Sequence, residues 1–306
     1  MQKRMISVLG TLAGVLMLMP ASVAGQDGPL RTPWGDPDLQ GTWSYASLTP
    51  LQRPTSMSDK EFFTAEEAAQ RNFAVTVDQP ARPGDVGSYN ALWFDRGEVS
   101  SDMRTSLIID PPDGRLPMTP DTQRRQTEQR EYAAAHPADS WVDRTNWDRC
   151  ISYHGVPPIS TGYNNSYHIL QTPTHVAIRV ENIHDVRIIP LDGRPQLDEG
   201  IRQWNGDSRA HWEGDTLVVE TANFSDLTVH RFPSSRNTKA VERYRRVSED
   251  LIETQFTIED ATVYTAPWTA VRPMPRLDDY VMYEYACHEG NYAMSNILMS
   301  ERSAEK

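Results

Sequence analysis

The sequence predicts a mainly β protein, an antiparallel barrel or sandwich in which a lipocalin-like meander is one arrangement. Three observations support this fold class. Segments that alternate apolar and polar residues recur after Cys150, connections of hairpin length separate them, and no pattern of alternating helices suggests a parallel sheet. Before Cys150, Pro, Asp and Arg are frequent and regular patterns are few. We therefore expect an irregular N-terminal arm with two short helices, followed by a β domain.

The first residues resemble an export signal. Lys3 and Arg4 precede an uncharged run from Met5 to Met19, and the small residues at 21–25 offer a cleavage site after Ala24. The run is shorter than the roughly 20 residues that a membrane-spanning helix needs, and no later stretch is apolar enough to span a bilayer. We expect residues 1–25 to be a signal peptide, with an uncleaved anchor as the alternative, and the mature protein to be periplasmic or secreted.

The arm, residues 26–149, is expected to contain four regular elements. Thr64 and Glu67 form a capping box in front of one short helix. Pro120, directly after Thr119, occupies the first position of a second, polar helix. The expected elements are strands at 38–45 and 105–109 and helices at 64–72 and 119–135.

The β domain, residues 150–306, repeats short alternating strands that end in turns. The clearest hairpin joins residues 209–212 to 216–221 through the turn at 213–215. Further strands are expected at 167–170, 175–181, 185–189, 241–247, 251–258 and 281–287. We expect the arm and the β domain to form one structural unit.

The charge of the chain argues against a nucleic-acid partner. The formal net charge is −12, and the densest basic stretch, Arg243 to Arg246, lies between Glu242 and Glu249. Too few Lys and Arg side chains cluster to neutralise phosphates. The mean hydropathy of −0.59 agrees with a soluble product. The sequence leaves the oligomeric state open.

The chain has two cysteines, Cys150 and Cys287. In an oxidising compartment, such a pair most simply forms one disulfide. Metal ligation or a reactive free thiol is the alternative. A disulfide would place the region of His154 beside His288.

Several strings resemble a large, uncharacterised family of exported bacterial proteins. DPDLQGTW, WEGDTLVVET and YACHEGNY are three of them. The six strings lie at 36–43, 48–54, 93–97, 188–195, 212–221 and 285–292. The resemblance implies export and a single structural unit, and it implies no reaction.

Common catalytic signatures are absent from the sequence. It contains no Gly-x-Ser-x-Gly elbow, no phosphate-binding glycine loop, no dinucleotide fingerprint and no His-Glu-x-x-His. The eight histidines include no pair spaced for one strand or helix. No cofactor is therefore predicted, and a divalent metal whose ligands meet only through the fold stays open.

The densest group of polar side chains lies between residues 163 and 187. The strand at 175–181 places His175, Arg179 and Glu181 on one face and apolar residues on the other. One interpretation is a solvated outer face with cross-strand ion pairs. The other is a barrel or cleft whose polar lining binds a ligand.

The second interpretation assigns roles to individual side chains. His184 would be the general base or acid, although a histidine bonded to a backbone carbonyl is the structural alternative. The complementary acid would be Tyr167 or His288. The remaining candidates would bind or orient substrate: Arg179, Arg187, Asn164, Asn165 and Glu181.

These features favour an exported enzyme that acts on a small polar or carbohydrate-like substrate by His/Tyr acid-base chemistry, as a lyase or hydrolase. Eight Trp and twelve Tyr suit stacking on sugars or other flat ligands, with core packing as the alternative. The first alternative is a non-catalytic periplasmic ligand-binding β-barrel protein, and a purely structural or assembly role is the second.

Overall fold

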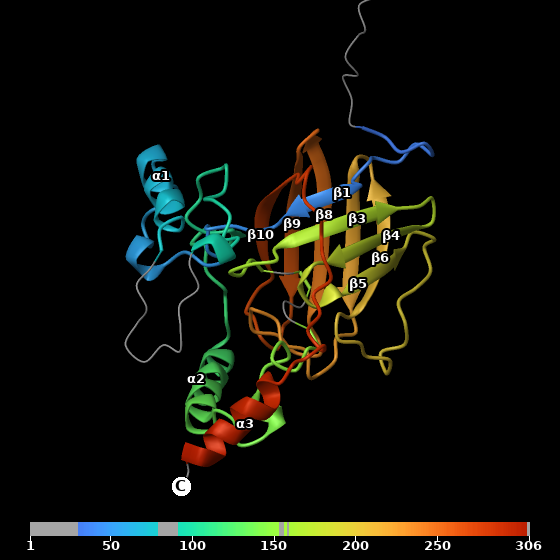
Figure 1. The fold of residues 1–306 in the computed structure, drawn as a ribbon. Coiled ribbons are helices and arrows are strands. Elements are labelled where there is room, and N and C mark those ends of the chain that lie inside the picture. Colours follow the sequence, from blue (N-terminus) through green and yellow to red (C-terminus); the bar gives the residue numbers. More distant parts are fainter. Residues whose placement is uncertain (1–29, 79–90, 153–155, 158, 305–306) are drawn as a thin grey trace, which may run out of the picture.

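The computed structural model describes residues 30–78, 91–152, 156–157 and 159–304. The expected signal peptide, residues 1–25, lies outside the described residues. Two antiparallel sheets face each other (Figure 1). Within the described residues they do not close into a barrel. The predicted mainly β, antiparallel class is confirmed, and the structure has the sandwich form of it.

The two sheets have four and six strands. The smaller has the order β1-β3-β4-β5 and the larger β2-β10-β9-β8-β7-β6. The bounds are β1 (Gly41–Ser44), β2 (Ile108–Asp110), β3 (Ser166–Gln171), β4 (His175–Val180), β5 (Val186–Pro190), β6 (Asp207–Glu213), β7 (Thr216–Ala222), β8 (Lys239–Ser248), β9 (Leu251–Glu259) and β10 (Trp268–Pro275). Because β1 and β2 precede Cys150, the arm contributes a strand to each sheet.

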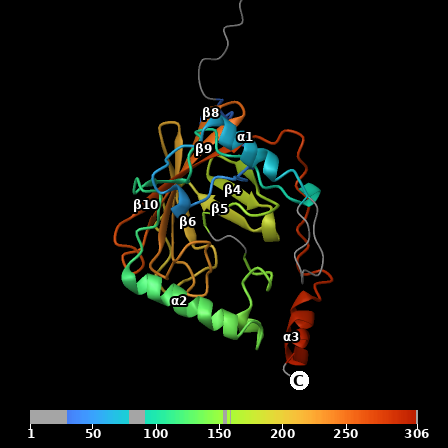
Figure 2. The same ribbon diagram turned by 90° about the vertical axis from the view of Figure 1, so that its left-hand side faces the viewer.

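The described residues form three α-helices, α1 (Ala65–Ala74), α2 (Pro120–Ala135) and α3 (Ala293–Ala304). Both predicted helices are present, and α1 begins at the predicted capping box: Thr64 Oγ1 accepts the Glu67 N–H and the Glu67 carboxylate accepts the Thr64 N–H. The prediction of only two helices missed α3. In Figure 2, α2 and α3 lie at the same end of the sandwich. The short 3-10 helices are η1 (Thr55–Met57), η2 (Ala91–Trp93), η3 (Trp141–Asp143) and η4 (Asn182–His184).

The last predicted strand is wrong. Residues 281–287 form no strand, and Val281 and Tyr283 are exposed, so their alternation does not mark a buried face. The strand of this region is β10. It was not predicted because Pro273 and Pro275 have a low propensity for strands. The β2 strand pairs with Thr269 and Ala270 at the start of β10, and the Val271 N–H donates to the carbonyl of Leu107. The later half of β10 is therefore a sheet edge, where proline is tolerated.

One face of β4 fills the interior, as its alternation predicts. Val176, Ile178 and Val180 are buried between the sheets. Arg179 lies on the opposite, outer face. The ionisable face of β4 therefore does not line the interior of the sandwich.

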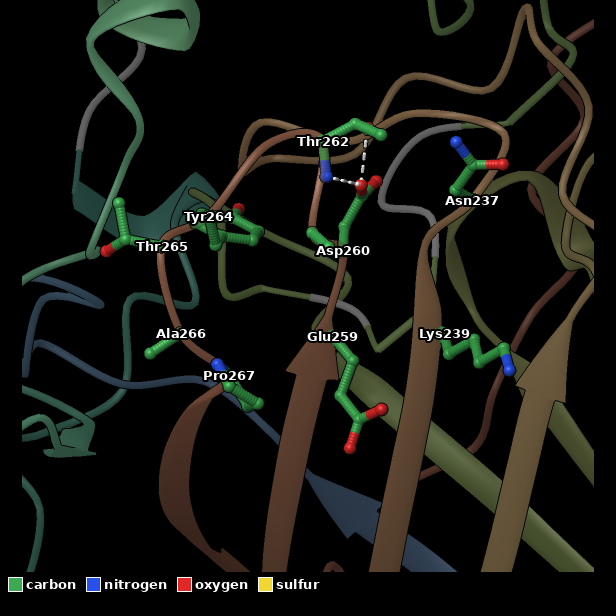
Figure 3. A pocket seen from close by; sticks show the side chains of 10 residues that line it. Asn237, Lys239, Glu259, Asp260, Thr262, Tyr264, Thr265, Ala266 and Pro267 are labelled. Atoms are coloured by element: carbon green, nitrogen blue, oxygen red, sulfur yellow. Dashed lines mark hydrogen bonds between the residues drawn. The ribbon is translucent and has the colours of Figure 1, made fainter.

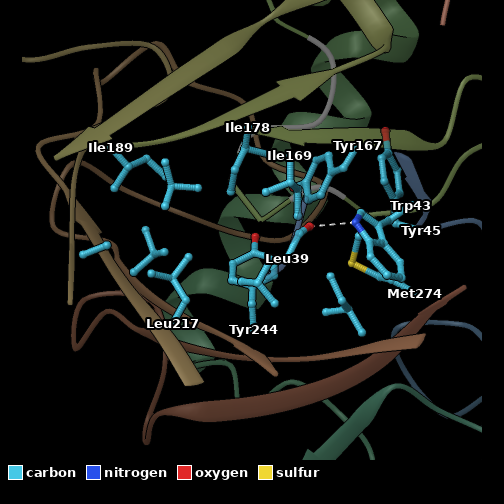
Figure 4. Packing of buried hydrophobic residues seen from close by; sticks show 14 of the residues in the cluster. Leu39, Trp43, Tyr45, Tyr167, Ile169, Ile178, Ile189, Leu217, Tyr244 and Met274 are labelled. Carbon is cyan, nitrogen blue, oxygen red and sulfur yellow. Dashed lines mark hydrogen bonds between the residues drawn. The ribbon is translucent and has the colours of Figure 1, made fainter. Parts of the chain in front are cut away.

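The larger core cluster combines aliphatic side chains with four buried aromatic ones (Figure 4). Trp43, Tyr167 and Tyr244 are fully buried in it. The Trp43 indole N–H donates to the carbonyl of Leu39 at 2.9 Å, so its one polar atom is satisfied. Each such side chain stabilises the fold by about 2 to 3 kcal/mol.

Cys150 and Cys287 form a disulfide, as predicted. The bond joins the segment before β3 to the segment after β10. Within the part of the chain that the structure describes, no helix has the length and apolar character to cross a membrane.

Candidate functional site

The predicted site residues occupy three regions of the structure. Two point between the sheets, three gather where β3 begins and β4 ends, and two lie on the outside. In that order they are Tyr167 and Arg187; Asn164, Asn165 and Glu181; and Arg179 and His288. His184 is the last residue of η4, and its side chain lies outside what the structure describes.

Ionisable side chains occupy the middle of the sandwich. We call Tyr167, Arg187, Glu242, Tyr244 and Arg272 the polar belt. Arg187 Nη2 donates to Glu242 Oε2 at 2.6 Å and to the hydroxyls of Ser208 and Thr221 at 3.1 Å each. The Tyr244 hydroxyl donates to Glu242 Oε1 at 2.7 Å. The carboxylate is thus paired and hydrogen-bonded although it is buried.

The surroundings keep the belt tyrosines neutral. Burial and the charge of Glu242 raise the pKa values of Tyr167 and Tyr244 above their ordinary range. Arg187 Nε and Nη1 have no hydrogen-bond partner among the described residues. The belt therefore contains buried N–H donors that the described residues leave unsatisfied.

A second constellation lies where β4 ends. We call Glu181, Ser166, Tyr280 and Asp95 the Glu181 cluster. Glu181 is only 3% exposed. Its Oε2 accepts the Ser166 hydroxyl and its Oε1 accepts the Tyr280 hydroxyl, each at 2.5 Å. Each carboxylate oxygen thus has one hydroxyl donor, which satisfies a charge that would otherwise be costly to bury.

The turn after Glu181 has an unusual backbone. Ile183, in η4, has φ 57° and ψ 14°, a left-handed conformation that is strained for a β-branched residue. Asn164 across the turn also has a positive φ of 55°. The Asn182 amide ties the two together by donating to the carbonyl of Asn164 at 3.2 Å. Backbone strain of this kind concentrates at functional sites.

Asp95 adds a second carboxyl group to the cluster. Burial, followed by the negative charge of Glu181, raises the pKa of Asp95 above its ordinary value. Asp95 also lines a hollow of about 670 Å³ together with Phe94, Arg96 and Asp78. The residue as a whole keeps solvent exposure.

Asn165 holds the Asp95 segment in place. Its Nδ2 donates to the carbonyl of Asp95 at 2.7 Å and to that of Thr161 at 3.0 Å. Its Oδ1 accepts the Thr161 N–H at 2.8 Å. With its amide engaged in this way, Asn165 orients Asp95 in the structure, and its predicted role toward substrate stays a prediction.

Sequence reasoning missed three members of the cluster. Asp95 lies in the string at 93–97 that carries the family resemblance, so a signal for it was present. Ser166 follows the two predicted asparagines directly in sequence. Tyr280 had no signal, because it meets Glu181 from 99 positions away.

The outer residues belong to solvated surfaces. Arg179 Nη2 donates to the carbonyl of Tyr283 at 3.3 Å, and His288 is exposed beyond the disulfide. On β8, Arg243 pairs with Glu213 and Arg245 with Glu253. The interpretation of cross-strand ion pairs on an outer face holds for this strand.

A different hollow, of about 440 Å³, lies beyond the end of β9 (Figure 3). The carboxylate of Asp260 accepts the hydroxyls of Ser235, Thr238 and Thr262 at 2.6 to 2.8 Å. Although partial burial opposes it, these hydrogen bonds lower the pKa of Asp260. This carboxylate joins three loop hydroxyls, which is a structural role.

No group of three or more His, Cys, Asp or Glu side chains among the described residues is arranged to hold a metal ion. A third hollow, of about 470 Å³ beside the disulfide, is lined by Trp147, Tyr285 and Glu289. It contains none of the predicted catalytic residues.

Comparisons with known proteins give little. No family model matches the sequence, and no curated protein matches it. A crystal structure of the wild-type fluorescent protein UnaG is similar with a TM-score of 0.24 and 14% identity, over 37% of this chain and 72% of UnaG. A mutant of UnaG is similar with a TM-score of 0.26 and 13% identity, over 44% of this chain and 87% of the mutant. Similarity this low carries no conclusion about function.

Proposed function

We propose that this chain is an exported enzyme that acts on a small polar or carbohydrate-like substrate by acid-base chemistry, as a lyase or hydrolase, at the Glu181 cluster. The observation that carries the proposal is a pair of carboxyl groups in unlike surroundings. Glu181 is buried against two hydroxyls, whereas Asp95 lines a hollow and has a raised pKa. Enzymes that need an acid and a base often use two carboxyl groups held in different environments.

The two groups take complementary roles in this proposal. Asp95 is the general acid, because its raised pKa keeps it protonated to a higher pH than an ordinary aspartate. It gives that proton to the departing oxygen of the substrate. Glu181 is the general base and takes a proton from a water molecule or from a substrate C–H. In the lyase version, the electron pair of that C–H bond forms a C=C bond as the bond to the leaving oxygen breaks. In the hydrolase version, the water oxygen bonds to the substrate carbon as the bond to the leaving oxygen breaks.

Among the predicted catalytic residues, His184 remains the other candidate for proton transfer. It follows Glu181 by three positions, on the strained η4 turn. Tyr167 and His288 lie in other regions of the structure and have no role in this proposal. Arg179 and Arg187 are already engaged with Tyr283 and Glu242.

We also propose that the protein is periplasmic or secreted and belongs to the exported family that its sequence strings resemble. The pattern of residues 1–25 supports export. The Cys150–Cys287 disulfide also supports it, since disulfides persist in oxidising compartments.

The test is a turnover screen with carboxyl variants. Wild type, Glu181→Gln, Asp95→Asn and Asp78→Asn are incubated with glycosides, lactones and hydroxy acids, and products are followed by NMR. Loss of either catalytic group is expected to lower turnover by about 100-fold or more. Asp78 lines the same hollow and is the matched control. A substrate that Glu181→Gln converts as fast as wild type would remove Glu181 from the mechanism.

The second candidate function is ligand binding without catalysis, in the polar belt. The observation that favours it is the unpartnered Nε and Nη1 of the buried Arg187, which suit a carboxylate or carbonyl oxygen. Thermal melting in the presence of carboxylic acids tests it, with Arg187→Lys as the variant that keeps the charge and loses the planar fork. This candidate requires a shift for wild type that is lost in the variant.

A further inference from the structure

The segment that follows β10 lies over the smaller sheet. We call residues 276–287 the C-terminal strap; it forms neither a helix nor a strand. At its start, the Leu277 N–H donates to the carbonyl of Thr42 at 2.9 Å, and the Arg276 guanidinium lies 5.7 Å from the centre of the Trp43 ring. In Figure 1 the strap is the red trace that leads from β10 to α3.

Three tyrosines of the strap make hydrogen bonds to other parts of the protein. The Tyr280 hydroxyl reaches Glu181, the Tyr283 carbonyl accepts from Arg179, and the Tyr285 hydroxyl accepts the Trp147 indole N–H at 3.1 Å. Val281 and Tyr283 are 63% and 76% exposed. A segment with so little buried apolar surface has low local stability. Its covalent anchor is Cys287, bonded to Cys150.

Tyr280 differs from Ser166 in how it is held. Ser166 belongs to β3 and is buried inside the sheet framework, so it cannot leave Glu181 without disrupting the sheet. Tyr280 belongs to the strap and can leave. If it does, Glu181 Oε1 loses the hydroxyl donor that Tyr280 supplies.

We propose that Tyr280 is a positioning residue for Glu181 and that the Cys150–Cys287 disulfide locks the strap that carries it. The catalytic meaning of this inference rests on the proposed function of Glu181. With the disulfide closed, both ends of the strap are fixed and Tyr280 stays on the carboxylate. With the disulfide cleaved, the strap is held by non-covalent contacts alone, such as hydrogen bonds of about 1 kcal/mol each, and it opens.

The experiment follows the ionisation of Tyr280 by NMR on protein with ring-labelled tyrosine, with Tyr280→Phe to assign the signal. Burial and the hydrogen bond and charge of Glu181 raise the pKa of Tyr280 in the closed strap. Glu181→Gln is expected to lower it. The Cys150→Ser/Cys287→Ser double variant is expected to bring it close to the ordinary tyrosine value of about 10. The control, Tyr283→Phe, leaves it unchanged, because Tyr283 contributes only a backbone carbonyl.

Two results would overturn the inference. If Tyr280 titrates in Glu181→Gln as in wild type, it does not position Glu181. If Tyr280 titrates in the double variant as in wild type, the disulfide does not hold the strap in place. If the double variant does not fold, hydrogen exchange of the wild-type protein is compared with and without a thiol reductant. The inference requires the strap amides to exchange at least about tenfold faster on reduction and ahead of the β7 and β8 amides. Because no step needs a substrate, failure of the proposed function would be seen separately, as unchanged turnover in Glu181→Gln.

Discussion

Arg187 and Glu242 form an ion pair between the two sheets, with Nη2 and Oε2 2.6 Å apart and side chains that are 5% and 0% exposed. Arg187 comes from β5 in the smaller sheet and Glu242 from β8 in the larger. The pair therefore links the two layers by a charge contact within the polar belt. Such a pair adds little net stability compared with apolar residues of similar size. Removing one partner, however, strongly destabilises the fold, because the other charge is then buried without a counter-charge.

The first prediction concerns this pair. Arg187→Met leaves the Glu242 carboxylate buried without its counter-charge and is expected to lower the free energy of unfolding by about 3 to 5 kcal/mol. The double variant Arg187→Met/Glu242→Leu removes both charges and should recover most of that loss. Urea unfolding of the three proteins measures both effects.

The surface pair between Arg243 and Glu213 is the matched control for this series. Both side chains are partly or largely exposed, so water screens the charge that Arg243→Met would leave. The urea midpoint of that variant is expected to stay close to wild type. If Arg187→Met and Arg243→Met lowered the free energy of unfolding by similar amounts, burial would not explain the effect of removing an ion-pair partner.

The sequence could predict the strands that have one buried face. In β4 and β9, buried and more exposed residues alternate well enough to be recognised. The pattern fails where an interior position is polar, as at Glu242, Thr254 and Arg272, because alternation assigns such residues to the solvent. It also fails for β10, whose prolines are tolerated only because its later half is an edge.

The candidate site was harder to predict, for a topological reason. Its central residue, Glu181, lies in the segment that the sequence singled out, which also contains Asn165 and His184. Its other carboxyl group, Asp95, comes from the arm, and Tyr280 comes from the strap. No local pattern relates three segments so far apart in sequence, because only the packing of the arm and strap against the smaller sheet brings them together.

The second prediction is that a buried histidine makes the fold sensitive to acid. His230 is buried between Phe224 and Phe232, and burial lowers its pKa from 6.5 to about 4. The unfolded chain therefore binds a proton more readily. Stability from this group is complete above pH 6.5 and is lost as the pH falls toward 4, by about 3 kcal/mol in all.

Unfolding measured between pH 4 and 7 tests this for wild type and His230→Phe. The variant is expected to lose much less stability over that window, because no imidazole remains to be charged on unfolding. Parallel curves for the two proteins would assign the acid sensitivity to other groups.

The third prediction concerns a glycine near the candidate site. Gly97 has φ +67°, and a Cβ there would lie 2.5 Å from the backbone carbon of Ala46. Gly97→Ala is expected to cost roughly 2 to 5 kcal/mol from the left-handed conformation and the clash together. Gly193 has φ +71° with open space around it, so Gly193→Ala should cost only about 1 kcal/mol. Equal thermal stability of the two variants would mean that the chain at Gly97 is not held against Ala46.

The last prediction connects Asp95 and Glu181 through their charges. The negative charge of Glu181 helps to raise the pKa of Asp95, after burial, so Glu181→Gln is expected to lower that pKa while burial keeps part of the increase. Asp78→Asn, in the same hollow, is the matched control. The titration is followed by NMR of the aspartate carboxyl carbons.

A raised pKa in the folded state means that protonated Asp95 favours folding, so this contribution to stability is lost as the pH rises through the raised pKa. The acid role proposed for Asp95 should be lost over the same range, because the proton that it donates is then absent. If the pKa of Asp95 is the same in wild type and Glu181→Gln, the two carboxyl groups do not interact, and the acid-base pairing has no electrostatic basis.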